Sequence, residues 1–379
     1  MVRTFMWRHS PRRLTRRGHD VIVYTRRDHP DLPEQVATRT GYVVEHVPAG
    51  PPTEIPKDNL LCYMPQFGEH LTERLLTDRV DVVHSHFWMS GLAAVPAARR
   101  AGVPLIHTFH ALGVVKRRHQ GVKDTSPPAR LRLERGLCCD VSHVIATCTD
   151  EVRELARLHL GPDRVSVIPC GVDTDAFRPG GSVAVRRGPR LLIAGRLVER
   201  KGVDDAIRAL ADVPGAELVV AGGPAAEDLD VDPEVVRLRR VAARCGLADR
   251  VLFLGRVSRT AMPALIRSAD VVLAVPWYEP FGIVPLEAMA CARPVVACAV
   301  GGLSDTVQDG RTGLLVPPRD PARIAEALRR LLADPQVRRD YGDAGLARAR
   351  ARYSWDRVAA DTEAVYQRAA VRTAAEVPS

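Results

Sequence analysis

Aromatic residues are scarce in this sequence, and their scarcity argues against one class of function. Phe, Trp and Tyr make up 5% of the 379 residues, and no basic run carries interleaved aromatic residues. Proteins that bind single-stranded nucleic acid combine a basic groove with aromatic side chains on which the bases stack. We therefore expect no nucleic-acid partner. The net charge of +9 is compatible with a basic solvated surface, with anionic substrates, or with peripheral contact to an anionic membrane.

Long apolar runs and paired cysteines are also missing. No segment reaches the roughly 18 consecutive apolar residues of a transmembrane helix, and residues 1–17 lack the apolar core of a signal peptide. The eight cysteines show no C-x-x-C or zinc-type spacing, and most lie in apolar runs. This pattern is typical of reduced, buried thiols in a cytoplasmic protein. We expect a monomer or a homodimer.

Glycine is absent from the first 13 residues, which also contain no β-branched run. From Leu14 the pattern predicts a helix end, a stop at Gly18 and a buried strand from Val21. A doubly wound sheet normally builds its first ligand loop after its first strand. We therefore expect the first strand and its loop to be lacking. Either the gene model is truncated or frame-shifted at its start, or the protein has no such loop.

Apolar strands alternate with helical segments along the rest of the chain. This alternation predicts an α/β fold with parallel sheets and helices on both faces. Ligands of such sheets bind beyond the carboxyl ends of the strands. His84, His86 and His110 fall at those ends. One histidine there is more often a capping or core residue, but three in one domain favour a site.

The most informative stretch is residues 276–290, PWYEPFGIVPLEAMA, which follows a valine-rich strand. The pattern from Ile283 predicts a helix to residue 291, and its N-terminus would offer unpaired N–H groups to a phosphate. Gly282 would permit a close approach of the ligand. Glu279 and Glu287 can accept hydrogen bonds from paired hydroxyls of a sugar or a ribose. The combination favours a nucleotide sugar over the simpler interpretation of one solvated and one capping glutamate.

The spelling Glu279-Pro-Phe-Gly-Ile-Val-x-x-Glu287 resembles the E-x7-E motif of the retaining glycosyltransferases of family 4, which have the GT-B fold. Three further segments are similar to that family: HSHFWMSG (84–91), HTFHALG (107–113) and IPCGVDTDAF (168–177). The first two look most like the branch that contains sucrose-phosphate synthases and the inositol-phosphate transferase of mycothiol synthesis. The resemblance covers residues 14–367.

The resemblance implies two Rossmann-like domains, each with a doubly wound parallel sheet, that face each other across a cleft. Residues 1–178 would form the acceptor-binding domain, with its first strand lacking. Residues 179–354 would form the nucleotide-sugar domain. Residues 355–379 would form a helix that crosses back to the first domain.

Arginine and lysine mark the donor side of this prediction. Arg196 and Lys201 lie in a loop after an apolar strand, where both can reach one diphosphate, although two solvated loop cations are the simpler alternative. In the family, the Arg and Lys of this G-R-L-x-x-x-K-G pattern bind the donor diphosphate, and a loop similar to residues 255–257 contacts the base. The implied donor site comprises Arg196, Lys201, Arg256, Val257, Phe281, Gly282, Ile283, Val284 and Glu287.

The resemblance also implies a mechanism, which is transfer of a hexose with retention by front-face attack. His110 resembles the family histidine that contacts the donor sugar, and Glu279 would orient that sugar rather than act as nucleophile. No D-x-D carboxylate pair at a strand end is placed to hold a metal on the diphosphate. We expect neither a metal nor a cofactor, because Arg196, Lys201 and the helix N-terminus at Gly282 can neutralise the leaving group.

The acceptor side departs from the family pattern. In the inositol-phosphate enzymes a Lys, a Tyr, a Thr and an Arg hold the acceptor phosphate, and local alignment places these at Lys57, Phe87, Ala111 and Arg130. Phe87 and Ala111 cannot donate side-chain hydrogen bonds. We therefore predict a small, anionic, soluble acceptor, a sugar or a polyol, other than inositol 3-phosphate. The candidate acceptor-binding residues are Lys57, His86, Lys116 and Arg130.

Two other functions remain open at this point. A truncated or non-catalytic GT-B homologue would bind nucleotide sugar or a protein partner, and the missing first loop favours it. A sugar-nucleotide epimerase of the same fold is the other candidate function, but the motif that contains Glu279 and Glu287 does not belong to that class.

Overall fold

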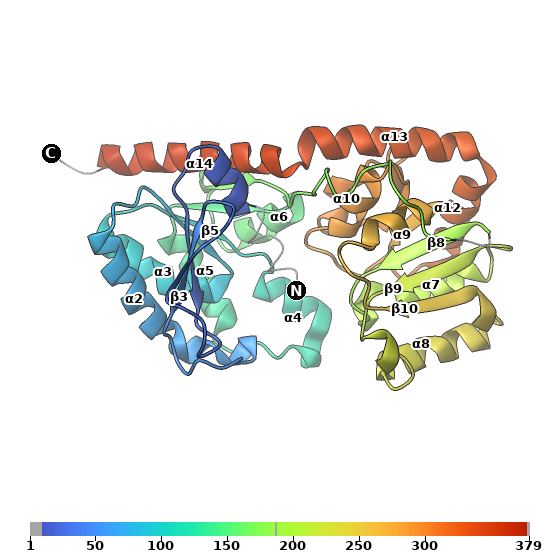
Figure 1. The fold of residues 1–379 in the computed structure, drawn as a ribbon, viewed down its shortest axis with the longest axis horizontal. Coiled ribbons are helices and arrows are strands. Elements are labelled where there is room, and N and C mark those ends of the chain that lie inside the picture. The colour runs from blue at the N-terminus through green and yellow to red at the C-terminus, as the bar shows by residue number, and fades with distance from the viewer. Residues whose placement is uncertain (1–9, 186–187, 377–379) are drawn as a thin grey trace. The chain divides into compact units, whose positions relative to one another are not determined.

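The computed structural model describes residues 10–185 and 188–376, and its contacts divide the chain into two compact units. The first unit comprises Met1–Pro169 and Trp355–Ser379, and the second comprises Cys170–Ser354. Both units combine β-sheets with packed helices, as Figure 1 shows, which confirms the predicted α/β class. The predicted absence of a first strand falls mainly on residues 1–9, which lie outside the described part of the chain.

Residues 170–178 pack with the second unit, although our sequence-based division assigns them to the first domain. The backbone N–H of Val172 donates to the carbonyl of Tyr353 at 2.7 Å. Phe177 is completely buried in a core that it shares with Leu192. These contacts put the start of the second unit at Cys170.

The strands of the first unit form two sheets. A three-stranded sheet has the order β1-β3-β2, in which β2 is antiparallel to β3, and a parallel four-stranded sheet has the order β4-β5-β6-β7. The antiparallel β2 was not predicted, because three residues are too few to show an alternating pattern. The strands are β1 (Ile22–Arg26), β2 (Gln35–Ala37), β3 (Val43–Val47), β4 (Val83–His86), β5 (Leu105–Thr108), β6 (His143–Ala146) and β7 (Val165–Val167).

The helices of the first unit include one that comes from the far end of the sequence. α14 contributes Trp355, Val358 and Val365 to a buried cluster with Ile106 and Ile145 of the four-stranded sheet. The helices are α2 (Met64–Thr77), α3 (Trp88–Ala101), α4 (Gly113–Gln120), α5 (Arg130–Asp140), α6 (Thr149–Arg157) and α14 (Trp355–Glu376).

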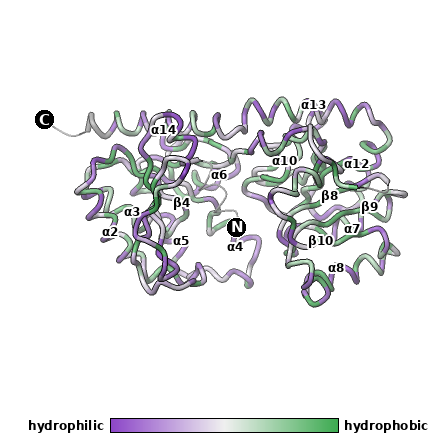
Figure 2. Tube along the Cα trace, viewed as in Figure 1, coloured by the Kyte–Doolittle hydropathy of each residue, from purple (hydrophilic) through white to green (hydrophobic). Residues whose placement is uncertain are grey.

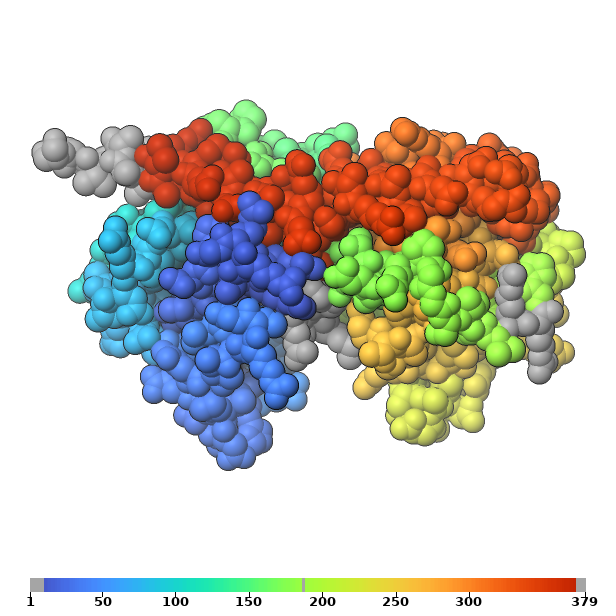
Figure 3. All heavy atoms as spheres, turned by 45° about the horizontal axis from the view of Figure 1, so that its top comes forward, coloured from blue at the N-terminus to red at the C-terminus, as the bar shows by residue number. Residues whose placement is uncertain are grey.

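The first described residues are tied to the same C-terminal helix. Residues 10–16 are helical. Arg13 pairs with Asp356 at 3.0 Å, and Glu363 accepts from Arg17 and from Nε2 of His19, the latter at 2.9 Å. Figure 3 shows these dark blue residues against the red helix. Ion pairs and the buried cluster together hold α14 to the first unit.

The second unit has one sheet of six parallel strands in the order β10-β9-β8-β11-β12-β13. Its strands are almost uniformly apolar because helices cover both faces, and Figure 2 colours β8 and β9 as largely hydrophobic. The strands are β8 (Arg190–Ala194), β9 (Glu217–Ala221), β10 (Val251–Gly255), β11 (Val271–Ala274), β12 (Val295–Cys298) and β13 (Gly313–Val316).

Alternate residues of β8 point to opposite faces of this sheet. Leu191 and Ile193 pack with α7, α8 and α12, whereas Leu192 packs with α9 and α10. The helices are α7 (Val203–Leu210), α8 (Pro233–Arg244), α9 (Met262–Ser268), α10 (Ile283–Ala290), α11 (Leu303–Thr306), α12 (Pro321–Ala333) and α13 (Pro335–Arg352). The helix predicted at residues 283–291 is α10, one residue shorter.

Among the described residues, no helix combines the length and apolarity that a membrane crossing requires.

Candidate active site

Glycines bring the loops at the carboxyl edge of the second sheet into contact. Gly202 has φ +68°, and a Cβ there would lie 2.1 Å from the carbonyl oxygen of Val275. A Cβ on Gly301 would lie 2.3 Å from the carbonyl oxygen of Glu279. A Cβ on Gly302 would lie 2.4 Å from the carbonyl oxygen of Pro280. Only residues without a Cβ allow backbones to approach this closely. The loops after β8, β11 and β12 therefore meet around Glu279.

Three cations and one carboxylate gather where these loops meet. The backbone N–H of Trp277 donates to the carbonyl of Arg200 at 2.9 Å, and the Arg200 guanidinium donates to the carbonyl of Tyr278 at 3.2 Å. Lys201 forms an ion pair with Glu279. Burial lowers the pKa of Arg200, Glu279 opposes this lowering, and Arg196 adds a smaller lowering. This edge of the sheet therefore brings three cationic side chains, Arg196, Arg200 and Lys201, close to Glu279.

The N-terminus of α10 faces the same loops. Gly282 caps the helix with φ +69°, and no side chain caps it. Ile283 and Val284 follow in the first turn and are half-buried, as is Phe281 before them. Backbone N–H groups in a first turn have no partner within the helix and attract anions. Cations and helix N-terminus together make this edge suitable for a diphosphate.

Glu287 lies in the second turn of α10, and 3% of the residue is exposed. Burial raises the pKa of its carboxyl group, and an ion pair with Arg259 opposes that rise. Arg259 follows β10 in the same loop as Arg256, which is exposed, and Val257, which packs against the core. Arg259 and Arg200 were not among the residues predicted from the sequence. A second arginine in a strand-exit loop was the available signal for each.

In the first unit, histidines connect two neighbouring strand ends. Nδ1 of His86 and Nε2 of His110 are 2.9 Å apart. The ring of His86 stacks on His84 at 4.1 Å, and His84 bonds to the hydroxyls of Tyr366 and Thr108 at 2.6 and 2.9 Å. Burial lowers the pKa of His86 to about 4 and that of His84 well below its ordinary value. Both rings are therefore neutral at pH 7.

Phe87 lies between two of the candidate acceptor cations. Its ring centroid is 5.7 Å from Nζ of Lys57 and 5.4 Å from the guanidinium carbon of Arg130. Arg130 is 2% exposed, pairs with Glu134 at 2.7 Å and donates to the carbonyl of Ala111. The four positions aligned with the phosphate-binding residues thus lie together. Glu134, however, already balances the charge of Arg130.

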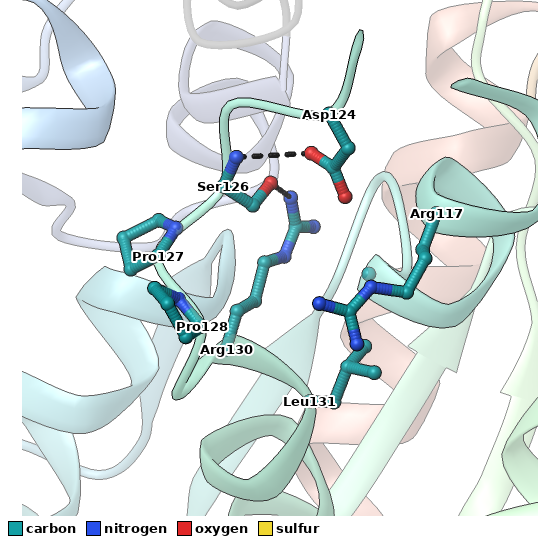
Figure 4. A pocket seen from close by; sticks show the side chains of 8 residues that line it. Arg117, Asp124, Ser126, Pro127, Pro128, Arg130 and Leu131 are labelled. Atoms are coloured by element: carbon teal, nitrogen blue, oxygen red, sulfur yellow. Dashed lines mark hydrogen bonds between the residues drawn. The ribbon is translucent and has the colours of Figure 1, made fainter. Parts of the chain in front are cut away.

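Lys116 belongs to the same polar network. Its ammonium group lies 2.8 Å from both Asp124 and the hydroxyl of Ser126, and this hydroxyl also accepts from Arg130 at 3.1 Å. Burial raises the pKa of Asp124, but hydrogen bonds from Lys116 and Ser126 outweigh it and lower this pKa to about 2. Asp124, Ser126 and Arg130 line a small pocket, which Figure 4 shows with Arg117 at its side. The cations of this region are thus largely paired with acids of the same unit.

Comparison with known proteins gives two family matches that together cover most of the chain. Residues 11–176 match Glycosyltransferase Family 4, and residues 182–348 match Glycosyl transferases group 1. A D-inositol 3-phosphate glycosyltransferase of Acidothermus cellulolyticus is 39% identical over 386 residues, which cover 96% of this chain and 85% of that protein. A protein of the same name from Mycobacterium tuberculosis is 36% identical over 371 residues, which cover 94% of this chain and 76% of that protein.

Solved structures of similar proteins agree with these matches. The sucrose-phosphate synthase of Thermosynechococcus elongatus has a TM-score of 0.86 and 30% identity, covering 97% of this chain and 93% of that one. The Anabaena protein HepE, solved in complex with UDP-glucose, has a TM-score of 0.69 and 22% identity, covering 86% of each chain. The second comparison supports the fold alone.

Proposed function

Because this chain belongs to the family 4 and group 1 glycosyltransferases of GT-B fold, we propose that it transfers a hexose, with retention and without a metal ion, from a nucleoside-diphosphate sugar to a small anionic acceptor. One observation carries the donor half of this proposal. Arg196, Lys201, the N-terminus of α10 and the buried Glu287 lie at one edge of one sheet. Cationic groups suit the diphosphate, and the carboxylate suits vicinal hydroxyls.

Lys201 and Glu279 form an ion pair with each other. Donor binding would bring the diphosphate to Lys201 and a sugar hydroxyl to Glu279. A carboxylate held by an ammonium group is a weak nucleophile, which supports an orienting role for Glu279. Retention would then follow from front-face attack, in which an oxygen of the departing phosphate takes the proton of the acceptor hydroxyl. The role of His110 at the sugar rests on the family resemblance.

Calorimetry with candidate nucleotide sugars tests the donor half. We expect Lys201→Ala and Glu287→Ala each to weaken binding by about 1.5–3 kcal/mol, because each leaves a charged hydrogen bond unmade. Lys123→Ala, at an exposed position of the first unit, is the matched control. Unchanged affinity in both variants would remove the donor-site assignment.

The metal independence that we propose has its own test. The positive loops and the helix N-terminus can stabilise the leaving diphosphate in place of a divalent ion. Transfer should therefore continue in excess EDTA. Loss of activity on chelation, restored by Mg²⁺ or Mn²⁺, would show that an ion takes part.

The acceptor half rests on the surroundings of Phe87. This residue and Ala111 supply no side-chain hydroxyl, and Glu134 already neutralises Arg130. A phosphate bound here would lose two neutral hydrogen bonds, each worth on the order of 1 kcal/mol. We therefore propose an anionic sugar or polyol other than inositol 3-phosphate. Inositol 3-phosphate is the second candidate, because the relatives at 36–39% identity carry its name.

An acceptor screen decides between the two. The full chain is incubated with UDP-, GDP- and ADP-sugars and a panel of sugar and polyol phosphates, and products are detected by mass spectrometry. We expect transfer to a soluble anionic acceptor and little to inositol 3-phosphate. Efficient use of inositol 3-phosphate, or of polyprenyl or phosphatidylinositol lipids alone, would contradict the acceptor assignment. Nucleotide-sugar binding without transfer to any acceptor would favour the non-catalytic homologue.

A further inference from the structure

Glu287 is a carboxylate in a position that disfavours its charge. Its side chain is 4% exposed and lies in the second turn of α10, whose last six residues are buried. Its Oε1 accepts a hydrogen bond from Nη1 of Arg259. Arg259 comes from the loop after β10, so the two partners are 28 residues apart in sequence. The ion pair therefore depends on the folded sheet edge rather than on local sequence.

Arg259 is held over an aromatic ring. Its guanidinium carbon lies 4.5 Å from the ring centroid of Phe177, which is completely buried. A planar guanidinium can lie on such a face while its edge donates to a carboxylate, whereas an ammonium group lacks this geometry. The side chain of Arg259 is 44% exposed. Arg259 thus links the buried acid to the solvent-facing side of the site.

The charges around Glu287 come from few groups. Burial raises the pKa of Glu287, and Arg259 is the group that lowers it. Cys291, one turn further along the chain, is a neutral thiol, because burial raises its pKa to about 12. Arg267 of α9 and Arg348 of α13 donate to backbone carbonyls. Arg259 is therefore the partner whose removal would leave the buried carboxylate uncompensated.

We infer that Arg259 is a positioning residue for the nucleotide, holding Glu287 in the ionised, acceptor-only form that two vicinal ribose hydroxyls require. This inference rests on the proposed assignment of Glu287 to the donor. A carboxylate has about four acceptor positions, so a bond to Arg259 leaves room for both hydroxyls. A protonated Glu287 would replace one accepting oxygen with an O–H donor and would lose the stronger hydrogen bonds that a charged acceptor makes. Donor binding would then require the loss of that proton.

Calorimetry of UDP-glucose, GDP-mannose and ADP-glucose binding between pH 6.0 and 8.5 tests this inference. Their diphosphates are diesters and do not titrate in this range. The wild type should bind one of them with little dependence on pH. Arg259→Gln should lose affinity toward low pH by up to about tenfold per pH unit, the limit for one proton that must leave. Binding to this variant should release protons, which appears as a dependence of the heat on the buffer.

Three further variants separate the inference from a general loss of structure. Arg259→Lys keeps the charge and should restore pH-independent binding, with weaker affinity than wild type. Arg259→Gln combined with Glu287→Gln should bind weakly at every pH without releasing protons. Arg323→Gln removes an exposed arginine of α12 that pairs with Glu326, and should behave as wild type.

The outcomes distinguish this inference from the proposed function. If the wild type binds none of the three nucleotide sugars, the donor assignment and this inference both fail. If the wild type binds and Arg259→Gln matches it at every pH, only the inference fails. A loss in Arg259→Gln that is equal at every pH and releases no proton would also overturn it, because Arg259 would then serve structure alone.

Discussion

Phe87 and His110 have positive φ angles, +73° and +62°, although both carry large side chains. Such backbone conformations are costly outside glycine and persist where the surrounding structure enforces them, often at functional sites. Phe87 follows β4 and His110 follows β5, two paired strands of one sheet. The strain thus marks the same strand ends at which Lys57 and Arg130 lie against the ring of Phe87.

Adding hydroxyls at these strand ends should change the preferred acceptor. Phe87→Tyr with Ala111→Thr supplies two donors beside Lys57 and Arg130. Each neutral hydrogen bond contributes about 1 kcal/mol, so we expect the KM for inositol 3-phosphate to fall about fivefold per substitution. The KM for the donor should not change. Phe87→Leu is the control, since it alters packing without adding a donor. An unchanged KM for inositol 3-phosphate in the double variant would refute the alignment of these positions.

At the scale of elements, glycine positions decide how closely the exit loops approach. Gly202 and Gly215 both have left-handed φ angles, +68° and +74°. A Cβ on Gly202 would strike the carbonyl of Val275, whereas a Cβ on Gly215 would meet nothing within 4 Å. Gly215→Ala should therefore cost only the left-handed penalty of about 1–2 kcal/mol in unfolding free energy. Gly202→Ala should cost more and should also weaken nucleotide binding, because Lys201 is next to it.

Urea unfolding and calorimetry of both variants check this prediction. Equal losses of stability would mean that the loops after β8 and β11 can separate without cost. Wild-type nucleotide affinity in Gly202→Ala would show that their contact does not position Lys201.

The sequence revealed those parts of the site that lie close together along the chain. Glu279, Gly282 and Glu287 form one local pattern, and the predicted helix start agrees with α10. The pair of Lys201 with Glu279 joins positions 78 apart, because β8 and β11 are neighbours in the sheet. Hydrophobic periodicity does not determine the order of strands in a sheet. The ion pairs of Lys201 and Glu287, and the position of Phe87 between two cations, could therefore be seen only in the folded structure.

At the scale of the whole molecule, the histidines, which titrate near neutral pH, are unevenly distributed between the two units. All twelve histidines lie at positions 9–159, so residues 170–354 of the second unit contain none. Burial lowers the pKa of His107 to about 3 and that of His86 to about 4. Their unfolded values lie near 6.5. As the pH falls below 6.5, these histidines take up protons in the unfolded chain before they do so in the folded one. The stability that their neutral, buried state contributes above pH 6.5 is therefore lost as the pH falls toward 3.

Hydrogen exchange at pH 6.5 and pH 5.0 should show this asymmetry, because ordinary carboxylates titrate lower. Amides of β5 and β6 should lose protection by up to about 1.4 kcal/mol per pH unit for each buried histidine. Amides of β8 and β11 should keep theirs. His29→Gln, at an exposed position, is the control. Equal loss of protection in both units would show that other groups control the acid response.

The first unit is made of two separate pieces of the sequence, and this has a consequence for synthesis. A ribosome completes residues 170–354 before it makes α14, so the continuous second unit can fold while the first still lacks a helix. Until α14 is made, the side chains of Ile106 and Ile145 lack Trp355 and Val358, against which they pack in the folded protein. A chain ending at residue 354 should therefore aggregate or recruit chaperones through its first half. Proteolysis of stalled nascent chains should find the later half of the sequence protected first.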